Sequence, residues 1–261
     1  MNKQLLVFAF CLLSLVFPSS AQVSLIPKVG MSFGTYQVNK VEDSEYVVGF
    51  AAGLGIQLPI PQNPIFSFQP EVNYIQKGTH YRKTDTPTNT PVDLPLQVES
   101  RNRLNYLEIP LLAKVTLGKG ALKYYFMAGP SIGIALGGNY RSQLTNTSQT
   151  LIEQEGKIRF KQKPAHYTGQ DAFFYPAGYN RLDVGIQIGT GIGLQVGNGM
   201  LLAEARYGRG LTYLLKHHIM YIRETHPDFG EIKVEFDRPA DMKSRTFVIS
   251  LGYMIAFGKI N

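Results

Sequence analysis

Bulky apolar residues alternate with small or polar residues along several stretches of this chain. Between residues 48 and 58, one face carries Val, Phe, Ala, Leu, Ile and Leu, while the other carries Gly, Ala, Gly, Gly and Gln. The same alternation recurs in 182–196 and near the end of the chain. A period of two places successive side chains on opposite faces of a β-strand. The pattern therefore predicts strands with one apolar face and one small or polar face.

Eight segments follow this pattern, and each is at least as long as the ~9–11 residues that a tilted strand needs to cross a bilayer. They are 24–36, 46–59, 64–77, 103–116, 122–137, 180–196, 200–213 and 243–258. Short connections (59–64, 117–121, 197–199) take turns with long ones (about 37–45, 78–102, 138–179, 214–242). Tight periplasmic turns and long external loops are typical of outer-membrane barrels. We therefore predict an all-β fold, an eight-stranded antiparallel up-and-down transmembrane β-barrel.

A soluble eight-stranded barrel such as a lipocalin is the structural alternative. Its cavity is apolar and its exterior is polar. Here the bulky set is aliphatic or aromatic, and the opposed set is glycine, alanine, serine and glutamine with occasional charges, which suits lipid outside and a narrow lumen inside. Aromatic residues near the strand ends predict interfacial girdles. They are Phe33, Tyr36, Phe66, Phe68, Tyr74, Tyr207, Tyr213, Tyr253 and Phe257.

The first 21 residues have the features of a secretory signal peptide. Lys3 supplies a basic start, 5–17 is apolar, and Ser19-Ser20-Ala21 gives small residues before the expected cleavage site. We expect 1–21 to be removed and 22–261 to form one barrel domain without disulfides, since the single Cys11 lies in the signal. The formal charge of +7 suits anionic surface lipid or polysaccharide better than nucleic acid, which an exported protein rarely meets. No cofactor is expected.

The stretch YLEIPLLAK at 106–114 resembles the hallmark strand of the PorT-like outer-membrane β-barrel family of Bacteroidota. Other segments fit the same template in order: SFQPEVNYIQKG (67–78), YYFMAGPSIGI (124–134), LLAEARYGRGLTYL (201–214) and SRTFVISLGYMIAF (244–257). The resemblance implies an outer-membrane location and assembly by the barrel assembly machinery. Because the family takes its name from a member linked to type IX secretion and gliding, it also implies an accessory role in that apparatus as one alternative.

Six charged residues fall on the lumen side of the predicted strands. They are Glu71, Glu108, Lys114, Asp183, Glu204 and Arg206. An eight-stranded barrel is just wide enough for side chains to fill, and charges buried there must pair. We predict a salt-bridge network in which Arg206 and Lys114 serve the carboxylates, either as a polar plug or as a gated ion path. Pro110 also faces the lumen and lacks a ladder donor, so we expect a local bulge there.

Basic and aromatic residues gather in the last two long loops. The predicted external binding surface comprises Arg141, Lys157, Arg159, Lys161, Lys163, Tyr167, Phe173, Phe174, Tyr221 and Arg223. The stretch 219–238 alternates enough that the flanking strands are expected to continue outward as a hairpin. Such loops on a rigid barrel could bind lipopolysaccharide, a glycan or a surface protein, or they could simply be solvated.

Residues for catalysis or metal binding do not come together in this pattern. All five histidines fall in predicted loops, and Ser67, Ser131 and Ser250 face the lumen. Glu71 and Glu108 could form an acid–base pair, but a plugged lumen admits no substrate. We therefore predict a non-enzymatic outer-membrane barrel without metal, whose external loops bind a surface ligand or partner. The alternatives are a narrow pore for small solutes and the secretion role.

Overall fold

A computed structural model describes residues 23–38, 44–85, 96–146, 149–158, 160, 179–214, 218–226, 230–238 and 242–257. The strands within these ranges are β1 (Val23–Val38), β2 (Ser44–Ile60), β3 (Asn63–Asp85), β4 (Leu96–Leu117), β5 (Leu122–Asn146), β6 (Gln149–Lys157), β7 (Leu182–Val196), β8 (Gly199–Gly210), β9 (His218–His226), β10 (Gly230–Arg238) and β11 (Met242–Phe257). The predicted signal peptide lies outside the described residues.

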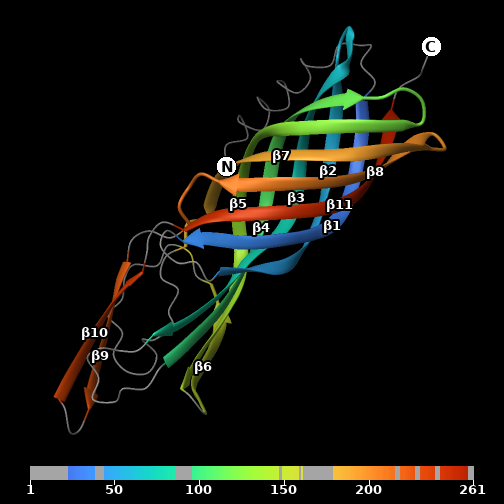
Figure 1. Cartoon of the computed structure of the whole chain (residues 1–261). Helices are drawn as coiled ribbons and strands as arrows, with labels where there is room; N and C mark the ends of the chain where they lie inside the picture. The colour runs from blue at the N-terminus through green and yellow to red at the C-terminus, as the bar shows by residue number, and fades with distance from the viewer. Residues whose placement is uncertain are drawn as a thin grey trace.

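Eight of these strands close into a ring. Each pairs with its neighbours antiparallel in the order β1, β2, β3, β4, β5, β7, β8, β11, and β11 returns to β1 (Figure 1). Val23, the first residue of β1, lies opposite Phe257, the last residue of β11. Both ends of the barrel sequence therefore lie at the side of the short turns, which confirms the predicted eight-stranded up-and-down barrel.

The bulky apolar residues of the alternating pattern form the outer face of the barrel, and the small or polar residues form its inner face. Phe50, Ile188 and Leu251 are about half exposed on the outside, whereas Ser32 and Ser250 are buried inside. A continuous apolar outer surface of this kind is suited to lipid, because large apolar patches are avoided where water is the solvent. Tyr36 is the exception to the predicted girdles: its side chain is fully buried at the long-loop end of the lumen.

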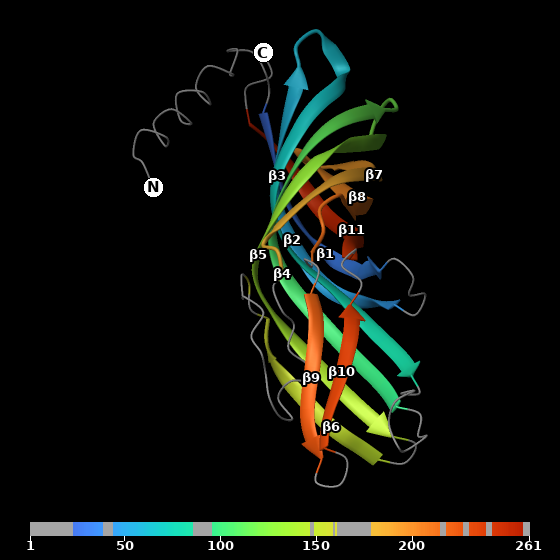
Figure 2. The ribbon, with the colours of Figure 1, turned by 90° about the vertical axis from the view of Figure 1, so that its left-hand side faces the viewer.

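Beyond the ring, the barrel continues as a sheet. The strands β3, β4 and β5 extend past the closed part, and β6 pairs with the extension of β5 (Figure 2). The segments 78–102 and 138–179 were expected to be loops. This prediction is wrong for 78–85, 96–102, 138–146 and 149–157, which form strands. The strands β9 and β10 form the expected hairpin, but in a two-stranded sheet of their own rather than as a continuation of β8 and β11.

The ladder around Pro110 is regular, which corrects the expected bulge. Pro110 is fully buried and lies opposite Ser131 of β5, and the pairs on either side keep the same register. The shift in this ladder lies instead beside Asn105 and Tyr106, where β5 carries the additional residue Leu136. Pro110 therefore removes one backbone N–H donor from the sheet without shifting the register of β4. The long ladders that β4 forms with both neighbouring strands fix that register.

Candidate functional site: a charged and closed lumen

Four charged side chains from three strands meet in the middle of the lumen. Lys28 on β1 donates to Glu71 on β3 at 2.7 Å and lies 3.3 Å from Glu204 on β8. Arg206 on β8 lies 2.8 Å from Glu71 and also contacts Glu204. All four side chains are at most 7% exposed. We call these residues the central cluster; its two cations and two carboxylates balance.

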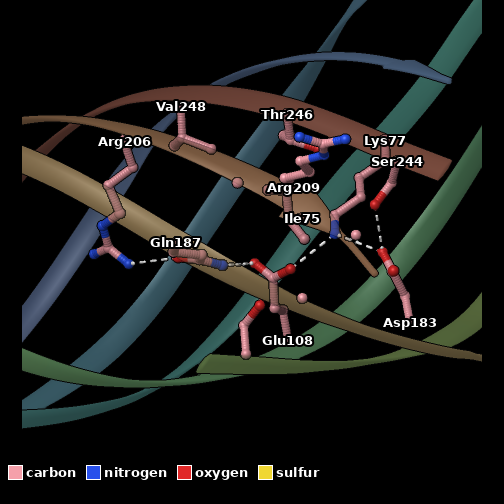
Figure 3. A pocket seen from close by; sticks show the side chains of 14 residues that line it. Ile75, Lys77, Glu108, Asp183, Gln187, Arg206, Arg209, Ser244, Thr246 and Val248 are labelled. Atoms are coloured by element: carbon pink, nitrogen blue, oxygen red, sulfur yellow. Dashed lines mark hydrogen bonds and ion pairs between the residues drawn. The ribbon is translucent and has the colours of Figure 1, made fainter. Parts of the chain in front are cut away.

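A second group of charges lies nearer the long-loop end and is named here the upper cluster. Lys77 on β3 is 2.8 Å from Glu108 on β4 and 3.1 Å from Asp183 on β7. The hydroxyl of Ser244 on β11 donates to Asp183 at 2.8 Å. Figure 3 shows these side chains converging from separate strands. Because the upper cluster has two carboxylates and one lysine, its remaining carboxylate oxygens depend on neutral donors.

Gln187 on β7 joins the two clusters. Its amide nitrogen donates to Glu108 at 2.8 Å, and its amide oxygen accepts from Arg206 at 3.5 Å (Figure 3). Buried charges are tolerated when they are both paired and hydrogen-bonded. The clusters and Gln187 thus form one connected network across the interior.

The six charged residues predicted for the lumen are all buried within it. Lys114 differs from its predicted role, however. It donates to Gln57 and Gln69 at 3.0 Å each and lies 4.1 Å from the centre of the Tyr125 ring, and no described carboxylate lies within ion-pair distance of it. Lys114 is instead linked to the carboxylates through Gln69 on the neighbouring strand β3, which donates to Glu71 at 2.6 Å.

Sequence reasoning predicted the pairing by Arg206 but missed the two lysines that also pair with the carboxylates. Lys28 shares its strand face with Ser24 and Ser32, and Lys77 shares its face with Glu71. The alternation that identified the six residues would have found both lysines, because each falls on the polar parity of a predicted strand.

Apolar layers close the lumen on both sides of the charged network. The layer toward the short turns contains Ile26, Leu112, Tyr125, Met127 and Leu202, with Met200 and Met254 packed against it. The layer toward the long loops contains Tyr36, Ala51, Ile75, Leu104, Tyr106, Ala135, Tyr140, Ile158, Tyr179 and Leu214, with Phe160, Met242 and Val248 packed against it. A solute on the barrel axis would have to pass both layers.

Segments from outside the strands complete the upper layer. Ile158 follows β6, Tyr179 precedes β7 and Leu214 follows β8. Backbone hydrogen bonds hold them in place: Ile158 donates to Gly138 at 2.7 Å and Leu214 donates to Met242 at 2.9 Å. The cover is therefore tied to the barrel wall on several sides.

Glycines on the inner face of β7 make room for the large side chains that cross the lumen. A Cβ atom at Gly191 would lie 2.3 Å from the Tyr125 ring, and one at Gly189 would lie 2.7 Å from Arg206. A small cavity beside the upper cluster measures about 20 Å³, enough for about one water molecule. The interior is thus packed rather than open.

Charges on the external sheet are also paired, but in contact with water. His80 lies between Glu45, at 2.8 Å, and Glu99, at 2.6 Å. Arg141 contacts Glu153 of β6, and this hydrogen bond lowers the pKa of the Glu153 carboxyl and raises that of Arg141. Arg141 was predicted to bind an external ligand, whereas the structure pairs it within the sheet.

The other residues of the predicted binding surface are only partly described. Lys157 is exposed at the end of β6. Tyr221 and Arg223 lie on β9 opposite Glu235 and Lys233. The remaining residues lie outside the described part of the chain: Arg159, Lys161, Lys163, Tyr167, Phe173 and Phe174. In the described ranges, no cluster of three or more His, Cys, Asp or Glu residues is arranged to hold a metal ion. Those ranges also contain no helix long and apolar enough to span a membrane.

The profile of the outer membrane protein beta-barrel domain family matches residues 19–216, about three quarters of the chain. The chain belongs to this family. The family and the closed ring of strands together place it in the outer membrane. No curated protein matches the chain.

Solved structures of similar shape include other outer-membrane barrels. Neisserial surface protein A is 13% identical, with a TM-score of 0.37, covering 89% of this chain and 97% of that one. The attachment invasion locus protein Ail of Yersinia pestis, in complex with a heparin analogue, is 11% identical, with a TM-score of 0.35, covering 90% and 99%. The Escherichia coli outer membrane protease OmpT is 11% identical, with a TM-score of 0.29, covering 91% and 96%. These scores are low, and the family match carries the assignment.

Proposed function

We propose that this outer-membrane barrel is a non-enzymatic surface protein, closed to solute flow, whose external sheet and hairpin bind a partner molecule. The observation that carries the proposal is the sealed lumen: a connected charge network lies between two packed apolar layers. Transport through this interior would require the network to separate. Removing one partner from a buried ion pair costs about 3–5 kcal/mol, which disfavours a path that opens by thermal motion.

The external part supports a binding role. The extensions of β3, β4 and β5 together with β6 form an ordered platform beyond the barrel, and β9 and β10 add a second sheet (Figure 2). Binding residues are commonly presented by segments that a rigid scaffold positions. The exposed Lys157 at the end of β6 adds positive charge to this platform. A surface glycan, lipopolysaccharide or a surface protein is the proposed partner class.

The resemblance of residues 106–114 to the PorT-like hallmark strand supports a finer assignment. Under that assignment the chain is a PorT-like barrel of Bacteroidota, exported by the signal at 1–21 and inserted by the barrel assembly machinery. The proposed surface partner would then be a component of a type IX secretion or gliding apparatus.

Conductance in planar bilayers tests the closed lumen. We expect the full-length barrel to give no steady single-channel steps. A variant carrying Tyr36→Ala, Tyr106→Ala and Tyr125→Ala thins both apolar layers and serves as a leak control. Steady steps from the unmodified protein at the amplitude of the triple variant would overturn the closed-barrel proposal in favour of a narrow pore.

Crosslinking on intact cells tests the external platform. The full chain is compared with a variant lacking 149–157, which removes β6 but leaves the eight-stranded ring. We expect a defined set of crosslinked surface molecules to be lost with β6 while heat-modifiability on gels is retained. Identical crosslinks from both proteins, or none from either, would count against binding at the sheet.

A further inference from the structure

Two arginines lie side by side on the outer wall at its long-loop end. Arg209 of β8 is directly opposite Arg245 of β11 in the ladder. Their neighbours Ser244, Thr246 and Gly210 are buried on the inner wall, so alternation directs both arginines outward. Arg209 is one of the residues that line the small cavity (Figure 3), but the residue is also exposed. The pair therefore faces the surroundings of the barrel.

The residues below this pair mark its depth in the membrane. The next outward pair toward the short turns is Tyr207 and Phe247, and the Phe247 ring lies 6.4 Å from that of Phe33. Below these come aliphatic residues such as Ile249 and Leu251, which are at least half exposed. The outer wall thus changes from aliphatic to aromatic to arginine. Aromatic rings mark the membrane interface, so the arginines lie at the level of the lipid headgroups.

The positive charges of this site have no protein counter-ion in the described part of the chain. Like charges directly opposite each other in a ladder repel. Neither arginine forms a salt bridge with a described carboxylate, and the Nε of Arg245 is a buried donor without a hydrogen-bond acceptor there. Lys243, the next outward residue on β11, adds a third cation, with its Nζ 4.7 Å from the centre of the Tyr213 ring.

The external sheet shows how the protein treats a similar arginine pair. Arg101 of β4 lies directly opposite Arg141 of β5. There Arg141 is ion-paired with Glu153, and Glu99 and Glu155 lie on the same sheet. The β4–β5 pair has carboxylates from the protein, whereas the β8–β11 pair has none among the residues that the structure describes.

We propose that Arg209, Arg245 and Lys243 bind the phosphate of an anionic lipid in the outer leaflet. A guanidinium group matches a phosphate with two parallel hydrogen bonds, and two guanidinium groups can share one phosphate. Such a phosphate would remove the repulsion across the ladder. The acyl chains of the lipid would lie along Phe247 and Leu251, so recognition combines a headgroup phosphate with an apolar wall.

Lipid binding by the full-length protein in detergent tests the proposal. The probes are diphosphoryl lipid A and the same lipid after removal of its phosphates, and native mass spectrometry counts the bound lipids. The Arg209→Gln/Arg245→Gln variant is compared with Lys119→Gln/Lys123→Gln, which removes the same charge at the short connection between β4 and β5. We expect the first variant to bind diphosphoryl lipid A at least about tenfold more weakly than the unmodified protein, and the control to bind it within about twofold.

Four outcomes would overturn the assignment, given that both variants remain heat-modifiable. Equal binding by the Arg209/Arg245 variant and the unmodified protein would remove the site, and an equal loss in the control would make it a general charge effect. Displacement of the lipid by inorganic phosphate at equal concentration would show that the site takes the free anion rather than a membrane lipid. Undiminished binding of the dephosphorylated lipid would show that the acyl chains alone are recognised.

Discussion

The lumen and the external sheet use the same charged residue types in opposite surroundings. In the central cluster, the side chains of Arg206 and Glu71 are 7% and 0% exposed. In the external sheet, the paired side chains of Arg141 and Glu153 are 59% and 44% exposed. Both pairs have short contacts, so geometry alone does not distinguish them. Their difference lies in what happens when one partner is removed.

In the lumen, a charged side chain that loses its ion-pair partner cannot be hydrated. A buried charge left unpaired carries its whole desolvation penalty, whereas an exposed charge is hydrated and screened. The contacts of the external sheet therefore direct strand pairing weakly, while those of the lumen decide whether the barrel is packed. Removing one arginine from each region is the direct test of this comparison.

Arg206→Ala should have the largest effect. It leaves Glu71 and Glu204 with Lys28 as their remaining cation and removes the link from the central cluster to Gln187. We expect the free energy of unfolding to fall by about 3–5 kcal/mol, measured by urea unfolding in lipid vesicles and by loss of heat-modifiability on gels.

A partial rescue would identify the cause of that loss. Adding Glu204→Gln to Arg206→Ala removes one of the two carboxylates that lost Arg206 as a partner. The double variant should therefore be more stable than the single one. An unchanged gel shift and unfolding midpoint for Arg206→Ala would contradict the network as the basis of packing.

Glycine positions sharpen the contrast between a filled interior and open surroundings. At Gly191 an added Cβ would meet the Tyr125 ring at 2.3 Å, whereas at Gly137 it would meet nothing within 4 Å. Gly191→Ala should therefore destabilise the barrel by about 1–3 kcal/mol through overpacking. Gly137→Ala is the matched control and should leave the unfolding midpoint nearly unchanged. Equal unfolding midpoints for the two variants would contradict the tight packing around Tyr125, because they would mean that the lumen accommodates an added methyl group.

The alternation of apolar with small or polar residues predicted the barrel well, because the two faces of each barrel strand correspond directly to that alternation. Alternation set which side of each strand meets lipid, and the lengths of the connections set the topology. The same signal placed Glu71 and Asp183 inside. It could not choose their partners, since Lys28 and Lys77 reach carboxylates on strands that are distant in sequence. Choosing among cations requires the shear and diameter of the closed ring.

The extended sheet was missed for a related physical reason. Residues 78–102 and 138–157 carry polar residues on both faces, so alternation is weak outside the membrane. Pairing there follows from the β3–β4 ladder, which continues in the same register, and from the β4–β5 ladder, which continues after a shift of one residue beside Tyr106. The register fixed inside the bilayer thus imposes strand structure on segments whose own sequence gives little sign of it.

Arg141→Gln should have the smallest effect and would complete the comparison with Arg206. Arg141 and Glu153 are solvent-exposed, so the unfolding midpoint should be unchanged within error near neutral pH. The pKa of the Glu153 carboxyl, lowered in the folded protein by the hydrogen bond from Arg141, should rise toward its ordinary value, as followed by carbon NMR of labelled glutamate. A carboxyl group with a lowered pKa stabilises the fold above its ordinary pKa, and this contribution is lost as the pH falls through the lowered value. Any difference in unfolding midpoint between the variant and the unmodified protein should therefore vanish in acid. It should also shrink in high salt, which screens exposed charges. A midpoint shift as large as that of Arg206→Ala would show that the external sheet, and not the lumen alone, holds the barrel together.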